Sequence, residues 1–349
     1  MLRQEIEIAG RTIGPDHPPY VICELSANHN GSLDRMLALV DAAAATGCDA
    51  IKIQTYTPQT MTLDSDRPEF RIAGGPWDGY TLYDLYSEAQ TPFEWHEALF
   101  ERARSHGLPM ISTPFDATAV DLLASLDVPA FKIASFELTD LPLVETVAQR
   151  GKPMILSTGL ASLGEIDEAV RVARKAGCEE IVLLHCVSSY PAADADTNLR
   201  TIPAMREAFG CPVGLSDHTR GHAVSVASVA LGACVIEKHF TLARSDGGPD
   251  SLFSLEPDEF VELCHTTRQA WDAMGKVTFD LRGQEKSNVQ FRRSIFATRD
   301  IEAGEPFTHD NVRVIRPGHG LAPKFLPIAL QRRARRRLSR GEPVTWDAL

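Results

Sequence analysis

Short apolar runs rich in β-branched residues recur along the chain up to His239, and most are followed by a stretch long enough for a helix. We expect eight strands, at residues 20–25, 49–55, 108–113, 130–135, 153–158, 180–186, 212–216 and 233–239. Helical periodicity marks residues 33–46, 92–106, 164–176 and 223–231. Alternation of strand and helix through eight units predicts an α/β fold, a (β/α)₈ TIM barrel. A doubly wound open sheet is the alternative, but no Gly-rich phosphate-binding motif follows any strand.

Polar side chains gather at the carboxyl-terminal ends of these runs. A strand in a parallel barrel is buried on both faces and should be almost entirely apolar. The exceptions here are Glu24, Lys52, Gln54, Ser112, Thr113, Lys132, Ser135, Ser157, Thr158, His185, Asp217, His218, Glu237 and His239. Active sites of such barrels form at that end, so we expect the functional site there.

The pattern changes after Phe253. An amphipathic helix at residues 256–274 and a polar connector precede a compact segment of short strands and turns. We therefore place a barrel domain at residues 1–280, a linker at 281–291 and a small second domain at 292–349. The basic run at 332–337 is interpreted as a solvated helix face, with acidic residues elsewhere in compensation.

Composition narrows the class of protein. The 349 residues carry a formal net charge of −12, which argues against nucleic-acid binding. Seven cysteines without a CxxC pair indicate reduced, mostly buried thiols. The first residues lack the apolar core of a signal peptide, and no apolar stretch is long enough for a membrane span. We expect a cytoplasmic protein that acts on small molecules.

Two histidines follow neighbouring strands, His218 after the seventh and His239 at the end of the eighth. Adjacent strands would bring both imidazoles over one pocket. Two histidine ligands leave positions on a divalent metal open for water and substrate oxygens, as a Lewis acid requires. Imidazole alone does not choose between Mn²⁺, Zn²⁺ and Fe²⁺.

Lys52 and Lys132 are each flanked by apolar residues, so strand alternation would turn both lysines into the barrel. A buried lysine needs a partner. We favour an anionic ligand carrying phosphate and carboxylate, with a Schiff-base lysine or internal ion pairs as alternatives. Glu24 and Glu137 are candidate carboxylates for a general base or for supporting the metal, with salt bridging as the structural alternative.

These motifs closely resemble the sialic acid synthase family along nearly the whole chain. That family joins a phosphoenolpyruvate-binding barrel to a C-terminal antifreeze-like (SAF) domain. The matching strings are Ala27-Asn28-His29-Asn30-Gly31, Lys52-Ile53-Gln54-Thr55, Ser112-Thr113-Pro114-Phe115, Lys132-Ile133-Ala134-Ser135, Ser157-Thr158-Gly159, Gly214-Leu215-Ser216-Asp217-His218-Thr219, Gly248-Pro249-Asp250 and Arg316-Pro317-Gly318.

The resemblance implies a role for each matching residue. His218 and His239 would hold the divalent ion, usually Mn²⁺, and Glu24 and Glu137 would serve catalysis. Contacts to phosphoenolpyruvate and its surroundings would come from Lys52, Gln54, Thr113, Lys132, Ser135, Ser157 and Ser216. Ser188 stands where the family carries asparagine, so its contact would be shorter or lost. Tyr190 and Asp250 would contact the amino sugar, and Arg316 would cross to the other subunit of a domain-swapped homodimer.

Within the family, residues 54–66 and 82–86 and the Ser135-Phe136-Glu137 string are most similar to members that make pseudaminic acid. The implied reaction joins phosphoenolpyruvate to 2,4-diacetamido-2,4,6-trideoxy-L-altrose. N-Acetylneuraminate or legionaminate synthesis is the nearest alternative, and a non-catalytic sugar-binding barrel is an alternative of another class. The long insertion after the second strand lies where substrate-selecting loops belong.

Overall fold

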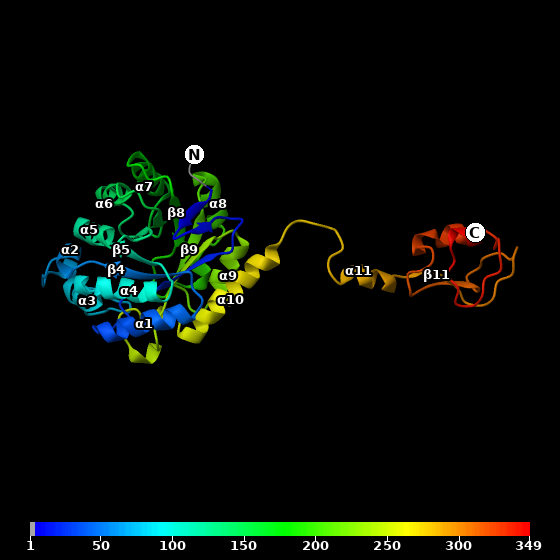
Figure 1. The fold of residues 1–349 in the computed structure, drawn as a ribbon, viewed down its shortest axis with the longest axis horizontal. Coiled ribbons are helices and arrows are strands. Elements are labelled where there is room, and N and C mark those ends of the chain that lie inside the picture. Colours follow the sequence, from blue (N-terminus) through cyan, green and yellow to red (C-terminus); the bar gives the residue numbers. More distant parts are fainter. Residues whose placement is uncertain (1–3) are drawn as a thin grey trace. The chain divides into compact units, whose positions relative to one another are not determined.

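Eight parallel strands close into a barrel in the computed structural model, which describes residues 4–349 (Figure 1). Around the barrel the strands follow in chain order, and β10 pairs with β3 to close it. They are β3 (Tyr20–Glu24), β4 (Ala50–Thr55), β5 (Met110–Pro114), β6 (Phe131–Ile133), β7 (Met154–Ser157), β8 (Ile181–Cys186), β9 (Val213–Asp217) and β10 (Val235–His239). Each overlaps one expected run, so the TIM-barrel prediction is confirmed.

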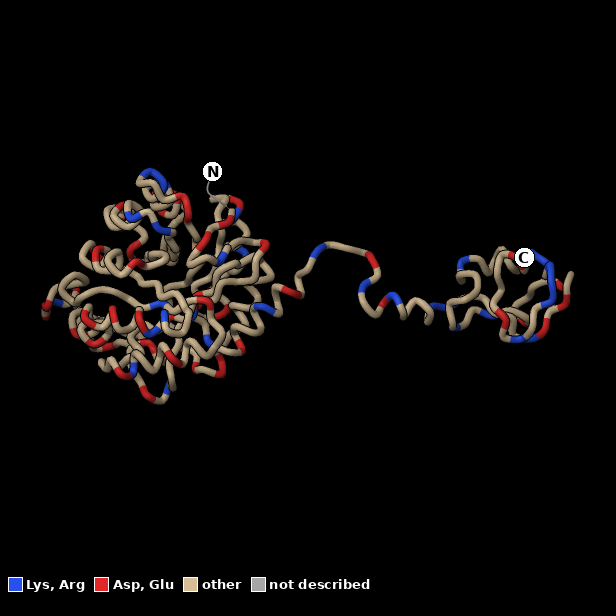
Figure 2. The backbone as a smooth tube through the Cα atoms, viewed as in Figure 1, with Lys and Arg blue, Asp and Glu red and all other residues tan. Residues whose placement is uncertain are grey.

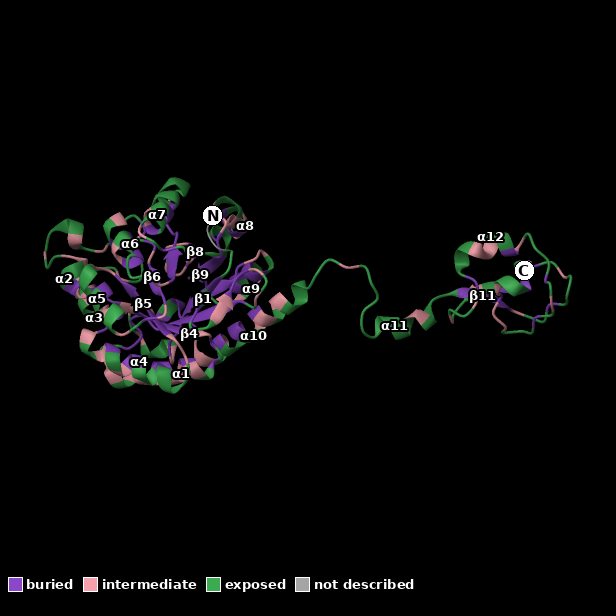
Figure 3. Ribbon diagram, turned by 45° about the horizontal axis from the view of Figure 1, so that its top comes forward, coloured by how far each residue is buried: buried purple, intermediate pink, exposed green. Residues whose placement is uncertain are grey.

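Helices cover the outer face of the barrel, and Figure 3 shows buried strands inside a partly exposed helical layer. They are α1 (Leu33–Ala45), α4 (His96–Ser105), α5 (Ala117–Ser125), α6 (Leu141–Ala148), α7 (Leu163–Lys175), α8 (Thr201–Phe209), α9 (Ala223–Ala230) and α10 (Pro257–Met274). Side-chain caps fix where several begin: Ser32 accepts a hydrogen bond from the Arg35 amide, and Ser162 forms a capping box with Glu165.

Strand alternation divides the barrel into two apolar layers. Outward side chains such as Ile51 and Ile53 of β4 pack in one cluster with the helices. Inward side chains such as Ile155 and Leu184 form a second cluster, joined by isoleucines of an N-terminal hairpin, β1 (Ile6–Ile8) and β2 (Arg11–Ile13). The hairpin packs against the residues that begin the strands, so it lies at the end opposite the expected site. The sequence analysis did not anticipate it.

The insertion between β4 and α4 contains two short helices, α2 (Pro58–Met61) and α3 (Leu82–Ala89). Backbone hydrogen bonds between Ile72 and both Gly79 and Tyr80 close a turn between these helices. The insertion is therefore a folded element with its own internal contacts.

The second compact unit begins at Lys276. It contains α11 (Glu285–Asn288), the antiparallel pair β11 (Ser294–Ala297) and β12 (Val312–Ile315), and α12 (Leu326–Ala329). Its own buried cluster includes Ile295, Phe307 and Leu338. A short helix, α11, thus occupies part of the segment expected to be a linker.

The basic run at 332–337 does not lie on a helix, so that part of the interpretation was wrong. Local turns and isolated bridges replace the helix because these residues pair with distant segments of the unit. The expected acidic compensation is present: Arg336 contacts Glu342 at 2.5 Å and Asp347 at 2.9 Å, and Arg337 contacts Asp300 at 3.1 Å. Figure 2 shows basic and acidic positions interspersed in this unit.

Two further expectations concern thiols and membranes. All seven cysteines are buried and free of disulfides, as predicted. Within residues 4–349, no helix has the length and apolar character that crossing a bilayer requires.

Gly214 of β9 gives a test of barrel packing. A Cβ at this position would overlap the Val235 carbonyl oxygen of the next strand and lie 2.7 Å from Cδ2 of Leu184. We predict that Gly214→Ala lowers the free energy of unfolding by about 3 kcal/mol. The Val235 backbone on β10 cannot move away from the added methyl group without breaking hydrogen bonds between β9 and β10. Gly164→Ala, at an open position early in α7, should stabilise by about 0.5–1 kcal/mol. Urea unfolding of both variants measures the difference, and equal stabilities would contradict the packing argument.

Candidate active site

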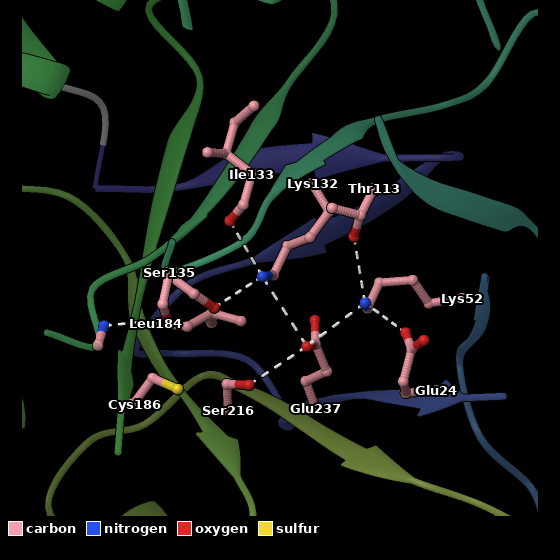
Figure 4. Close-up of polar contacts among 12 residues, drawn as sticks. Glu24, Lys52, Thr113, Lys132, Ile133, Ser135, Leu184, Cys186, Ser216 and Glu237 are labelled. Atoms are coloured by element: carbon pink, nitrogen blue, oxygen red, sulfur yellow. Dashed lines mark hydrogen bonds and ion pairs between the residues drawn. The ribbon is translucent and has the colours of Figure 1, made fainter. Parts of the chain in front are cut away.

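Four charged side chains meet inside the barrel near its carboxyl-terminal end (Figure 4). Glu24, Lys52, Lys132 and Glu237 come from β3, β4, β6 and β10, and each is at most 4% exposed. The ammonium of Lys52 contacts the Glu24 carboxylate and lies 3.6 Å from Oε1 of Glu237. The ammonium of Lys132 lies 3.9 Å from the same Oε1. One carboxylate oxygen therefore faces both lysines.

Hydroxyl groups complete the surroundings of these charges. Lys52 donates to Oγ1 of Thr113 at 3.3 Å, and Lys132 donates to Oγ of Ser157 at 2.6 Å. Ser216 donates to Oε1 of Glu237 at 3.2 Å. The predicted lysines and hydroxyls thus converge on one place, where they offer ammonium and hydroxyl donors to an anion.

The environment assigns different charge states to the carboxylates. Burial raises the pKa of Glu24 to about 7, although Lys52 opposes this shift. Burial also opposes ionisation of Glu237, but Lys132 and Lys52 outweigh it and hold the Glu237 pKa below its usual value. The pKa of Lys52 is raised because the two carboxylates overcome its burial. Lys52 and Glu237 therefore form an ionised pair, while Glu24 exchanges its proton near neutral pH.

Glu237 is the site residue that sequence reasoning missed. It was noted as a polar strand end but given no role, and the partner expected for the lysines was an anionic ligand. In the chain alone, internal carboxylates contact or face both lysines, so the ion-pair alternative is present; anion binding stays a prediction. The sequence could have indicated this role, because Glu237 and His239 are two residues apart on β10 and therefore face the same side of the strand.

His218 and His239 lie together at the mouth, with ring centroids 5.4 Å apart. Nδ1 of His218 is 3.0 Å from the carbonyl oxygen of Val187. A carbonyl only accepts, so this nitrogen carries a proton, and in the neutral ring Nε2 is then the nitrogen that keeps a lone pair for a metal. Nδ1 of His239 is buried and, among the residues that the structure describes, has no hydrogen-bond partner.

The two imidazoles fit a divalent metal with few protein ligands. Over residues 4–349, no group of three or more His, Cys, Asp or Glu side chains is arranged to hold a metal ion. The chain would thus supply two imidazole nitrogens, and the remaining positions would be open to water and substrate oxygens. An orphaned buried imidazole nitrogen beside a second, oriented imidazole is the observation that supports the fit.

A cavity of about 530 Å³ opens at this mouth. Six of the predicted site residues line it: Gln54, Glu137, Ser188, Tyr190, His239 and Asp250. Burial raises the pKa of Glu137 to about 7, and its Oε2 atom has no hydrogen-bond partner within the described part of the chain. The Tyr190 ring packs 4.5 Å from the His218 ring, centroid to centroid. The sugar-binding candidates therefore share one cavity with His239, and His218 packs against Tyr190 of the same cavity.

Ser135 and Ser188 approach each other across Gly159. The Gly159 amide donates to Oγ of Ser135 at 3.1 Å, and a Cβ on this glycine would collide with the hydroxyls of both serines. Glycine at this position keeps both hydroxyls at the site. Ser188 thus reaches the cavity despite its short side chain.

Not every polar strand end belongs to the site. The Ser112 hydroxyl bonds to the Thr55 hydroxyl at 2.6 Å. Nε2 of His185 lies 2.5 Å from the Thr197 carbonyl oxygen, and the Asp217 carboxylate pairs with Lys238 at 2.8 Å. Strand alternation explains why these three side chains lie outside the site, because the residues next to them on each strand are the ones that point into the barrel. Arg316 is exposed and lies after β12 in the second unit, which is described by itself.

Comparison with known proteins identifies the family of the chain. The model of the NeuB family matches residues 39–279, and the SAF domain matches residues 292–349. A pseudaminic acid synthase of Campylobacter jejuni is 44% identical over 329 residues, covering 94% of this chain and 96% of that protein. A pseudaminic acid synthase of Helicobacter pylori is 42% identical, covering 95% of this chain and 97% of that protein.

Among solved structures, the N-acetylneuraminic acid synthetase of Leptospira borgpetersenii superposes with a TM-score of 0.74 at 32% identity. The superposition covers 82% of this chain and 96% of that one. A family model that matches more than half of the chain, together with relatives that align along nearly all of it, shows that the chain belongs to the NeuB family, the sialic acid synthase family.

Proposed function

We propose that the chain acts as a pseudaminic acid synthase. It condenses phosphoenolpyruvate with 2,4-diacetamido-2,4,6-trideoxy-L-altrose and releases phosphate. The observation that carries this proposal is the convergence of two imidazoles, two lysines and several hydroxyls at one barrel mouth, in a chain whose relatives include pseudaminic acid synthases.

The buried cluster is suited to phosphoenolpyruvate. Lys52 and Lys132, with the hydroxyls of Thr113 and Ser157, neutralise and hold the phosphate and carboxylate. C3 of phosphoenolpyruvate forms the new bond to the aldehyde carbon, and water adds to C2. Glu24, with a pKa near neutrality, accepts one proton of that water. The C2–O bond to phosphate then breaks as the C2 hydroxyl loses its proton and becomes the ketone. The two protons of the water end on the former aldehyde oxygen, which becomes a hydroxyl, and on the released phosphate.

A divalent ion, Mn²⁺ in this proposal, would be held by His218 and His239. When bound it supplies a Lewis acid that polarises the aldehyde oxygen. The Val187 carbonyl fixes the ring orientation of His218, and Tyr190 packs against the same ring. These contacts keep the imidazole ready for a ligand without reorganisation.

The assembly in this proposal is a domain-swapped homodimer in the cytoplasm. Arg316 is exposed in the second unit and would complete the site of the other subunit, as the family resemblance implies. Seven free, buried thiols are consistent with a reducing compartment.

The acceptor is tested by phosphate release with each purified hexose, with and without Mn²⁺. We expect kcat/KM for the 2,4-diacetamido-2,4,6-trideoxy-L-altrose to exceed that for N-acetylmannosamine and for the legionaminic acid precursor by at least about tenfold. Mass spectrometry should show a nine-carbon acid. Faster turnover of another hexose would overturn the acceptor assignment, and no turnover of any would indicate a non-catalytic barrel.

The metal site is tested by binding of Mn²⁺ alone to the purified chain. His218→Ala and His239→Ala should each weaken Mn²⁺ binding by at least about 100-fold, because each removes one of two protein ligands. His265→Ala, on the exposed face of α10, is the matched control and should bind as the parent does. Unchanged affinity in both site variants would refute the assignment.

Glu137 should contribute to the pH dependence of the reaction. Burial raises its pKa to about 7, with Lys132 opposing and Asp140 adding to the shift. The carboxylate forms as pH rises through about 7, so a catalytic carboxylate predicts a kcat/KM that falls below that pH. The glutamine of Glu137→Gln cannot ionise. This variant should lower kcat/KM about 10²-fold or more, and its kcat/KM should fall less steeply as the pH drops below about 7. An unchanged acid limb at an unchanged rate would remove Glu137 from catalysis.

A further inference from the structure

The cavity at the barrel mouth has two chemically different walls. Residues of the barrel and its loops provide the polar wall, which carries Gln54, Glu137 and Asp250 beside apolar residues such as Phe115 and Phe136. The insertion between β4 and α4 contributes Tyr56, Tyr86 and Ala89 together with five large apolar side chains, Met61, Ile72, Trp77, Leu82 and Leu85. We call these five residues the apolar wall.

Trp77 joins the apolar wall to the polar wall. Its indole Nε1 donates to the carbonyl oxygen of Pro249 at 2.9 Å, directly before Asp250. Its ring packs against Tyr190 with centroids 5.6 Å apart. Tyr190 in turn packs against His218, so the insertion contacts the side of the cavity where the reacting aldehyde would lie.

Hydrogen bonds within the insertion hold the turn that carries Trp77. Ile72 accepts from the Gly79 amide at 3.1 Å and donates its own amide to Tyr80 at 2.9 Å, which closes the turn that carries Trp77. The Asp78 carboxylate accepts from the Gly74 amide at 2.6 Å within the same turn. A turn held by its own hydrogen bonds lowers the entropy cost of ordering the loop when a sugar binds.

We infer that the apolar wall selects the acceptor sugar, favouring a 6-deoxy sugar with N-acyl groups over a hydroxyl-rich sugar of similar size. This inference rests on the proposed function and deepens it by assigning specificity to residues of the insertion.

The physical reason is the cost of leaving a hydroxyl without a partner. A sugar hydroxyl against Ile72 or Leu82 would lose its bonds to water and gain none from the wall. A C6 methyl or an acetamido methyl gains contact in the same place. Differences of one such group in an apolar pocket change kcat/KM by about 10- to 200-fold.

The test compares 2,4-diacetamido-2,4,6-trideoxy-L-altrose with N-acetylmannosamine as acceptors for the full-length enzyme. Ile72→Asn and Leu82→Gln should each lower kcat/KM for the trideoxy sugar about tenfold, mainly through KM, and narrow its advantage over N-acetylmannosamine. Leu63→Gln is the matched control, because Leu63 lies in the same insertion, is 67% exposed and does not line the cavity. It should keep the parent ratio.

Each outcome bears on one statement. An unchanged ratio of the two acceptors in both wall variants, with parent-like melting temperatures, overturns the inference. Met61→Gln, at a half-buried position, replaces either variant if that variant fails to fold. A parent enzyme that turns over neither acceptor would instead contradict the proposed function, which the parent assay alone reveals.

Discussion

The structure depends on balancing four charges inside the barrel. Lys52 and Lys132 need counter-charges to remain ionised in an apolar interior; Glu237 supplies a fixed one that faces both lysines, and Glu24 supplies a second to Lys52 when it is ionised. Removing one partner of such a buried set leaves an uncompensated charge, which costs about 3–5 kcal/mol. The four residues come from β3, β4, β6 and β10, so the balance holds only when the barrel is closed in this register.

The side chains on the two sides of this charged level differ in polarity. The level below is apolar and includes Ile155 and Leu184, with the N-terminal hairpin packed against its far end. The level above holds the imidazoles and the cavity. An anion that reaches the lysines is therefore bounded by apolar packing on one side, while its reactive end faces the cavity. In the proposed function this arrangement would place the substrate and the group that polarises it in one low-dielectric space, where electrostatic effects are strong.

Three carboxyl groups near the site differ because their neighbours differ. Glu237 faces two lysines and stays ionised, whereas burial raises the pKa values of Glu24 and Glu137 to about 7. One group therefore holds fixed charge, while the other two exchange protons near neutral pH. The apolar wall adds a different kind of selectivity, because it discriminates by the absence of hydrogen-bond partners.

The sequence by itself determined the eight strands, the polar strand ends and the inward direction of both lysines. These features depend on local period and alternation, which a chain carries without reference to its partners. The N-terminal hairpin, the pairing of Glu237 with both lysines, the loss of the expected helix at 332–337 and the contact of Trp77 with Pro249 were decided by tertiary structure. Each depends on which distant residues meet, and that is set by the register of the closed barrel and the packing of its loops. Alternation along a strand predicts which way a side chain points, but the residues that it contacts are set only when the barrel closes and its loops pack.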